Sequence, residues 1–286
     1  MLPFQLDALV QTALLEDAPW GDASAVLFKD DAQNIHARLV ARQNGVFCGS
    51  TIWQRTFHII DPTVVCTLHI VDGATFSPGQ VLASVHGNAR AILRAERVAL
   101  NFVQRMTGIA TLTAHYVRAV AHTHARIADT RKTTPGLRIL ERAAVRAGGG
   151  SNHRYCLSDA VMIKDNHWAA MGCTSLAERT AALQLLRQQI GHTMSIVVEV
   201  DTLAELPAIL AADVDVILLD NFTIADLQTA VDQIQRRAVV EASGGIQLSR
   251  VAEVAQTGVD VISVGALTHG ITAIDLGLDM DAYPCK

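Results

Sequence analysis

Two cations, Arg131 and Lys132, stand where a short apolar segment ends and a turn begins. The segment, 125–128, is typical of a strand. Thr134 and Pro135 are typical of a helix start, with threonine as the N-cap and proline as the first helical residue. A helix N-terminus attracts anions through its unpaired N–H groups and its dipole. The pattern therefore predicts a site for a strongly negative ligand, although a solvated basic turn would use the same residue types.

Six short segments rich in valine and isoleucine could form the strands that position these cations. Buried parallel strands have this continuous apolar character, and segments with helical patterns separate the six. Such alternation predicts a parallel sheet or an α/β barrel, with fewer strands than the eight of a complete barrel. The candidate strands are 126–128, 160–163, 196–200, 214–219, 239–242 and 261–264.

Polar or small residues follow each of these strands. In an α/β barrel the carboxyl ends of the strands form the face that carries the active site. One charged strand end would be unremarkable, but a complete set predicts one shared site. The residues are Asp129, Arg131, Lys132, Lys164, Asp165, Asn166, His167, Glu199, Asp201, Asp220, Asn221, Ser243, Gly244, Gly245 and Gly265.

The cationic side chains of this set predict a ligand with more than one negative group, because an unmatched buried charge is costly. A triple glycine, 148–150, precedes two of them and would let the backbone pass close to a ligand. A flexible connector and a core histidine are the simpler interpretations of the glycines and of His153. The cations are Arg131, Lys132, Arg138, His153, Arg154 and Lys164.

The carboxylates Glu199 and Asp220 end successive strands. They could hold Mg²⁺ together with substrate phosphates, accept hydrogen bonds from ribose hydroxyls, or stabilise a developing positive charge. Helix capping or ordinary salt bridges remain alternatives.

Small residues after the last two strands could bind a phosphate through free backbone N–H groups. Phosphate sites after the final strands recur in α/β barrels. The residues concerned are Ser243, Gly244, Gly245, Ser263 and Gly265.

The N-terminal part of the chain has a different pattern. It predicts a helix over 5–15, strands within 64–71 and 80–85, and a long helix over 91–106, as in a compact α/β layer domain. The character of the chain changes near Thr107-Gly108. Arg97 lies on the polar stripe of the long helix, where exposure to solvent is its simplest interpretation.

Composition excludes several classes of function. The 286 residues carry a net charge of -5 and only 5% aromatic residues, so nucleic acid is not an expected partner. Five cysteines without a CxxC pair indicate reduced thiols in the cytoplasm, and neither a disulfide framework nor a zinc site. No apolar run approaches the roughly 18 residues of a membrane span.

Taken together, the motifs resemble those of the quinolinate phosphoribosyltransferase family, also called nicotinate-nucleotide pyrophosphorylase (carboxylating). The resemblance covers nearly the whole chain. Its motifs are Glu96-Arg97, Leu100-Asn101, 107–111, 128–133, Gly148-Gly149-Gly150, Asn152-His153-Arg154, 163–167, 198–201, 218–221, 241–245 and 265–269.

The resemblance implies an N-terminal α/β sandwich domain over 1–107 and an open six-stranded α/β barrel of the type II phosphoribosyltransferase kind over 108–270. A tail, 271–286, would pack back on the N-terminal domain. It also implies a cytoplasmic homodimer with a shared active site, in which Arg97 reaches the site of the neighbouring subunit.

The implied reaction joins quinolinate to phosphoribosyl pyrophosphate and releases pyrophosphate and CO₂, with Mg²⁺ as cofactor and nicotinate mononucleotide as the product that feeds NAD synthesis. Lys132, Lys164, Glu199 and Asp220 would be catalytic. By resemblance, quinolinate carboxylates are held by Arg97, Arg131, His153, Arg154 and Lys164. Lys132 would serve the pyrophosphate, with Arg138 shared or supporting. Glu199 and Asp220 would face the ribose and Mg²⁺, and the 5-phosphate would lie on Ser243, Gly244, Gly245, Ser263 and Gly265.

Three alternatives stay open at this stage. A related phosphoribosyltransferase would act on another base. A Schiff-base aldolase would use Lys164 as its nucleophile. A non-catalytic sensor would bind a phosphorylated ligand without releasing CO₂.

Overall fold

The structure is a computed structural model that describes residues 3–27 and 33–281. The chain divides into two compact units, the first from 1–114, 133–149 and 270–286 and the second from 115–132 and 150–269. Four cysteines, Cys48, Cys66, Cys156 and Cys173, are free thiols, and Cys285 lies outside the described residues.

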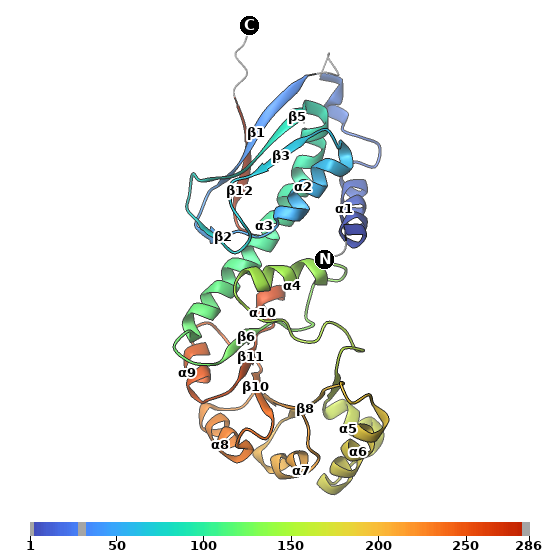
Figure 1. Ribbon diagram of the computed structural model, residues 1–286, viewed down its shortest axis with the longest axis vertical. Helices are drawn as coiled ribbons and strands as arrows, with labels where there is room; N and C mark the ends of the chain where they lie inside the picture. The colour runs from blue at the N-terminus through green and yellow to red at the C-terminus, as the bar shows by residue number, and fades with distance from the viewer. Residues whose placement is uncertain (1–2, 28–32, 282–286) are drawn as a thin grey trace. The chain divides into compact units, whose positions relative to one another are not determined.

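The first unit contains a four-stranded antiparallel sheet with strand order β12-β1-β5-β3, beside a two-stranded sheet of β2 and β4 (Figure 1). Large side chains from the sheet and from α2 build its core, among them Leu39, Leu82, Trp53 and Phe57, which are fully buried. Its elements are α1 (Pro3–Asp17), η1 (Ala23–Leu27), β1 (Asn34–Ala41), β2 (Gly45–Val46), α2 (Ser50–Ile60), β3 (Val65–Leu68), β4 (Thr75–Phe76), β5 (Val81–Asn88), α3 (Ala89–Val120), α4 (Arg138–Ala147) and β12 (Leu276–Met280).

Strand β12 comes from the C-terminal segment and pairs antiparallel with β1, with Leu278 opposite Leu39. The predicted tail, 271–286, includes this strand, while 282–286 lie outside the described residues. The compact units differ from the predicted domains at 108–114 and 133–149, which belong to the first unit. The domain boundaries themselves stay a prediction.

Helix α3 is longer than predicted, because it continues through Thr107-Gly108 to Val120. Gly108 does not end the helix. It allows a close approach, since a Cβ atom there would lie 2.4 Å from the carbonyl oxygen of Thr272. The hydroxyl of Thr107 donates to the carbonyl of Cys48 at 3.1 Å. Both residues that suggested a break are therefore packing contacts within the first unit.

The prediction that a helix begins at Thr134-Pro135 is wrong, since α4 begins at Arg138. The Leu137 amide donates to the Thr134 carbonyl at 3.0 Å, and Gly136 has a φ of +80°. Proline and then a positive-φ glycine at the centre of a turn are typical of type II. The pair therefore forms a turn before the helix, and Thr134 Oγ1 accepts from Arg105 instead of capping α4.

The second unit contains six parallel strands in the order β6-β11-β10-β9-β8-β7. No pairing joins the edge strands β6 and β7 within the described residues, so the sheet is an open barrel, as the predicted fold class requires. Its strands are β6 (Arg126–Ala128), β7 (Val161–Ile163), β8 (Ile196–Val200), β9 (Val216–Asp220), β10 (Val239–Ser243) and β11 (Val261–Ser263).

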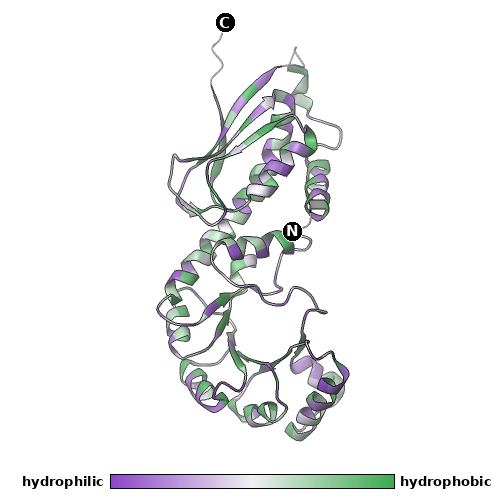
Figure 2. Ribbon diagram, in the orientation of Figure 1, coloured by the Kyte–Doolittle hydropathy of each residue, from purple (hydrophilic) through white to green (hydrophobic). Residues whose placement is uncertain are grey.

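Helices lie between these strands in the chain, and the strands themselves are largely hydrophobic in colour (Figure 2). Thr223 caps α8 by accepting from the amide of Asp226, whereas Thr202, at the start of η2, makes no side-chain cap bond. The helices are α5 (Asp165–Met171), α6 (Leu176–Gln189), η2 (Leu203–Glu205), α7 (Leu206–Leu210), α8 (Ile224–Ile234), α9 (Val251–Gln256) and α10 (Ala266–His269).

Candidate active site

A cavity of about 260 Å³ opens at the carboxyl ends of the barrel strands in the second unit. Six of the fifteen residues predicted from strand ends line it together, Arg131, Lys132, Lys164, Glu199, Asp220 and Ser243, as expected where the carboxyl ends of parallel strands meet. The lining residues are Thr130, Arg131, Lys132, His153, Arg154, Met162, Lys164, Glu199, Leu218, Asp220, Glu241, Ser243 and Ser263.

Five members of the predicted cationic set, Arg131, Lys132, His153, Arg154 and Lys164, line this cavity. Burial, and next the charge of Arg131, lowers the pKa of Arg154. Nη1 of Arg154 donates to the Ala160 carbonyl at 2.8 Å, while its buried Nε has no hydrogen-bond partner in the described part of the chain. Lys132 has no ion-pair partner among the described residues. The cavity thus concentrates positive charge that an anionic ligand would balance.

Asp129 holds the loop that carries His153 and Arg154. Its side chain is fully buried, and its oxygens accept from Asn152 Nδ2 at 2.6 Å and from the His153 amide at 2.7 Å. The Ser151 amide also donates to the Ile127 carbonyl at 2.7 Å, so this part of the loop lies beside β6. His153 and Arg154 are therefore on a loop that hydrogen bonds hold at the end of a strand.

Glu241 is a lining residue that the candidate set did not include. It lies within β10, is 4% exposed, and has its Oε1 atom 3.3 Å from Nε2 of His153. The hydroxyl of Ser263, predicted to bind phosphate, donates to the same carboxylate. The sequence could have identified Glu241, because it is a charged residue inside an otherwise apolar strand, and a buried acid of this kind needs a partner.

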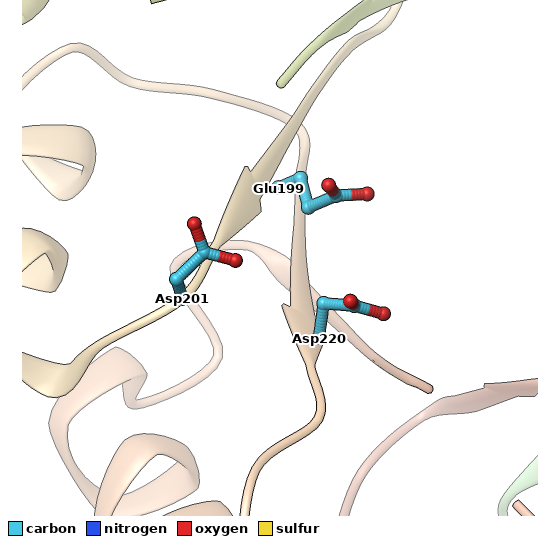
Figure 3. A group of neighbouring side chains, drawn as sticks. All are labelled: Glu199, Asp201 and Asp220. Atoms are coloured by element: carbon cyan, nitrogen blue, oxygen red, sulfur yellow. The ribbon is translucent and has the colours of Figure 1, made fainter. Parts of the chain in front are cut away.

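Three carboxylates meet at the ends of β8 and β9 (Figure 3). Glu199, Asp201 and Asp220 each offer an oxygen within 4.8 Å of the others. Glu199 also accepts a hydrogen bond from the ammonium group of Lys164. Burial, followed by the charges of Glu205, Asp165 and Asp220, raises the pKa of Asp201. Ionisation of Asp201 is therefore disfavoured, and hard cations prefer carboxylate oxygens such as these three residues offer.

The turn after β10 is shaped by a contact with the end of β9. Gly244 has a φ of +96°, and a Cβ atom there would lie 2.3 Å from Oδ1 of Asn221. The Asn221 amide donates to the Ser243 carbonyl at 3.0 Å, and its Nδ2 donates to Asp220 at 2.6 Å. This turn and the carboxylate of Asp220 are consequently one hydrogen-bonded structure.

Gly265 follows β11, and a Cβ atom there would lie 3.2 Å from Cδ of Lys132. Two other predicted residues, Arg97 and Arg138, belong to the first unit. Arg97 is exposed on α3, and Nε of Arg138 donates to Thr133 Oγ1 at 3.1 Å. Their roles, like the roles of the cavity residues, stay predictions.

No helix in the described part of the chain has the length and apolar character to cross a membrane.

Comparison with known proteins gives consistent matches. Residues 22–107 match the N-terminal domain of quinolinate phosphoribosyl transferase, and residues 109–279 match its C-terminal domain. The chain is 43% identical over 277 residues to the probable nicotinate-nucleotide pyrophosphorylase [carboxylating] of Bacillus subtilis, covering 96% of this chain and 93% of that protein. It is 39% identical over 296 residues to quinolinate phosphoribosyltransferase [decarboxylating] 1b of Nicotiana tabacum, covering 97% and 83%.

Solved structures give the same result. NadC from Streptococcus pyogenes has a TM-score of 0.91 at 37% identity, covering 98% of this chain and 97% of that one. Human nicotinic acid phosphoribosyltransferase, at 14% identity and a TM-score of 0.62, covers 99% and 75% and shares the fold.

Proposed function

The chain belongs to the quinolinate phosphoribosyltransferase family, and we propose that the cavity of its second unit is where the reaction takes place. The enzyme transfers phosphoribosyl from phosphoribosyl pyrophosphate to quinolinate with decarboxylation. Its products are nicotinate mononucleotide, pyrophosphate and CO₂, and the step belongs to NAD biosynthesis.

One observation carries the assignment to this cavity. Arg131, Lys132, Arg154 and Lys164 line the same space as Glu199 and Asp220. Quinolinate brings two carboxylates, and the second substrate brings a phosphate and a pyrophosphate, so both substrates need cations. The sugar becomes cationic as pyrophosphate leaves, so this centre needs a carboxylate. The cavity offers both kinds of group.

We propose for these residues the roles that the family resemblance implies. Arg131, Arg154 and Lys164 bind the quinolinate carboxylates, and Lys132 faces the pyrophosphate. Glu199 and Asp220 stabilise the oxocarbenium-like sugar at C1 while the pyridine nitrogen attacks it. The positive charge on that nitrogen then favours loss of the neighbouring carboxylate as CO₂. Because no covalent nucleophile is needed, positioning should supply much of the acceleration, roughly 7–11 kcal/mol.

The carboxylates Glu199, Asp201 and Asp220 fit Mg²⁺, which prefers oxygen ligands shared with substrate phosphates. The raised pKa of Asp201 supports this, because a nearby cation would relieve the crowding of negative charge. Bound Mg²⁺ would supply positive charge opposite the departing pyrophosphate. The pair with Lys164 partly balances Glu199, so we place Asp220 and Asp201 foremost in holding the ion.

The turn Ser243-Gly244-Gly245 and the residue Gly265 are proposed to hold the 5-phosphate through backbone N–H groups. Gly244 and Gly245 have positive φ, and nothing lies within 4 Å of a Cβ atom built on Gly245, so the backbone at Gly245 is open to a ligand. Ser263 is a weaker candidate for this phosphate than predicted, since its hydroxyl donates to Glu241.

The test is the release of CO₂ and pyrophosphate from quinolinate and phosphoribosyl pyrophosphate with Mg²⁺, with nicotinate as a parallel substrate. We expect one CO₂ and one pyrophosphate for each quinolinate consumed, and no product from nicotinate. Activity with nicotinate alone would refute the dicarboxylate assignment. Borohydride trapping of Lys164 with a carbonyl substrate would instead favour an aldolase, a function disfavoured by the pairing of Lys164 with Glu199.

We also propose a homodimer in which Arg97 completes the site of the neighbouring subunit. Its support is a group of large apolar side chains exposed in the first unit. Trp20 is 97% exposed, and Phe4, Leu15, Val26 and Leu27 are also exposed. Several large apolar side chains exposed within one segment of the chain are typical of surfaces that another protein covers.

Mixing two inactive variants tests the shared site. Arg97→Ala and Lys164→Met homodimers should each be inactive. If subunits exchange, mixed dimers carry one intact site, so activity should return to roughly a quarter of the wild-type value. No recovery, despite exchange shown by tagged subunits, would place Arg97 in the site of its own subunit.

A further inference from the structure

The buried acid Glu241 has no role in the reaction as described above, although it lies on the lining of the cavity. It is 4% exposed. A carboxylate in a cavity for anions repels the ligand unless protein donors satisfy its charge. Here the hydroxyl of Ser263 donates to the carboxylate, and Nε2 of the His153 ring lies 3.3 Å from it. Glu241 therefore interacts with other side chains of the protein and not directly with the ligand.

The hydrogen bonds of His153 define which of its nitrogens carries the proton. The backbone amide of Arg154 lies 2.6 Å from Nδ1 of His153. A backbone N–H can only donate, so Nδ1 accepts and the ring proton is on Nε2. Nε2 lies 3.3 Å from Oε1 of Glu241, so the carboxylate faces the nitrogen that carries the proton. A carboxylate that holds one histidine tautomer in this way also fixes the orientation of the ring.

We propose that Glu241 is a positioning residue for the quinolinate end of the cavity. With Ser263 it holds His153 in the Nε2–H tautomer, and Nδ1 in turn fixes the amide of Arg154, whose guanidinium binds a substrate carboxylate. The proposal rests on the function proposed above, and it adds a chain of contacts from β11 and β10 to the loop 151–154.

The proposal changes the part assigned to His153. Both ring nitrogens are engaged with the protein, so His153 acts through position and not as a cation. The charge of quinolinate then rests on Arg131, Arg154 and Lys164. Asp129, which binds the His153 amide, fixes the same loop from its other side.

Glu241→Ala and Glu241→Gln separate hydrogen bonding from charge. Alanine removes the acceptor for Nε2–H, so the KM for quinolinate should rise about tenfold while the KM for phosphoribosyl pyrophosphate changes less than about twofold. Glutamine keeps an acceptor oxygen in the same place, so Glu241→Gln should restore the KM for quinolinate to within about threefold of wild type. Equal damage by both variants, or an equal rise in both KM values, would overturn the proposal.

Ser263→Ala provides a second variant that leaves the acid in place. It removes one of the two donors, so a smaller rise in the KM for quinolinate, about threefold, is expected. Circular dichroism and thermal melting identify variants that do not fold. A folded Ser263→Ala protein whose KM rises only for phosphoribosyl pyrophosphate would show that the network serves the phosphate and would refute the proposal.

The tautomer can be measured without any activity. In protein labelled with ¹⁵N-histidine, the His153 signals are identified among the 11 histidines by their loss in His153→Asn. Wild type should show a protonated Nε2 and a bare Nδ1, and Glu241→Ala should show a mixture. A protonated Nδ1 in wild type would overturn the proposal. If the wild-type protein releases no CO₂, the proposed function is refuted, but the measured tautomer of His153 still tests the contact with Glu241.

Discussion

Gly244→Ala and Gly245→Ala form a matched pair of changes in the turn after β10, and we predict that only the first is severely damaging. The two residues have φ of +96° and +56°. A methyl group on Gly244 would lie 2.3 Å from Oδ1 and 2.6 Å from the backbone nitrogen of Asn221. A methyl group on Gly245 would meet no atom within 4 Å.

The expected sizes follow from these two environments. A φ of +56° lies in the left-handed region, which alanine enters at about 1–2 kcal/mol. Alanine also reduces the conformational entropy of the unfolded chain, which stabilises the folded state by about 0.4–1 kcal/mol. The net loss of stability in Gly245→Ala should therefore be about 1 kcal/mol. A φ of +96° lies outside that region, and the clash adds about 1–3 kcal/mol, because the amide of Asn221 is held by the Ser243 carbonyl. Gly244→Ala should therefore cost about 3–5 kcal/mol.

The clash in Gly244→Ala should also lower the reaction rate. It displaces Asn221, whose Nδ2 donates to the carboxylate of Asp220 at 2.6 Å. A displacement of about 1 Å in a catalytic group costs on the order of 10²-fold in rate, so kcat/KM should fall by about this factor in Gly244→Ala. Urea unfolding followed by circular dichroism measures the stability difference, and pyrophosphate release measures the rate. If the free energies of unfolding of the two variants agree within about 0.5 kcal/mol, the reasoning is refuted, because mutational effects on stability are usually consistent to within about that value.

Three further outcomes are expected. Lys164→Met leaves Glu199 without its cation and should lower kcat/KM by about 10²–10³-fold; a loss below threefold in the pyrophosphate assay would contradict the role of the pair. Asp201→Asn should raise the free energy of unfolding at neutral pH, because the raised pKa of Asp201 makes its ionisation unfavourable in the folded state. The gain should disappear below pH 3.8, the unperturbed value, where Asp201 is protonated in both states, as urea titrations at the two pH values would show. Arg105→Met leaves the carboxylate of Glu141, 1% exposed, without its ion pair and should destabilise the protein by about 3–5 kcal/mol; adding Glu141→Met should recover most of this loss in a thermal melt.

The strands of the second unit could be predicted because their signals are local. Strands β6 and β8 begin and end at the predicted residues, and the other four differ by at most two residues at either end. A buried parallel strand needs a continuous apolar run, and the polar or small residue at the end of each run marks where the strand ends. The same property made the cavity predictable, since six such ends meet at one face.

Helix boundaries were less predictable, because glycine and proline have several uses. Gly108 was interpreted as a break but serves a close contact with the carbonyl of Thr272, 164 positions later in the chain by the residue numbers. Pro135 was interpreted as the first residue of a helix but lies in a turn that precedes it. In both cases the sequence shows that the backbone is unusual at that residue. Whether the residue breaks a helix, allows a close contact or forms a turn depends on other residues, such as Thr272, that the local pattern does not include.

The cavity shows the same limit for side chains. Several cations stand at strand ends and together indicate an anion site, so Arg131 and Lys164 were found from the sequence. Glu241 has the opposite sign and lies inside a strand, and its meaning depends on His153 and Ser263, which come from different elements. Ser263 was assigned to phosphate because small residues after a strand have that use, yet its hydroxyl is directed to the acid. A sequence therefore predicts which groups a site must contain more readily than which of them bind each other, and that pairing decides whether His153 acts as a cation or as a fixed, neutral donor.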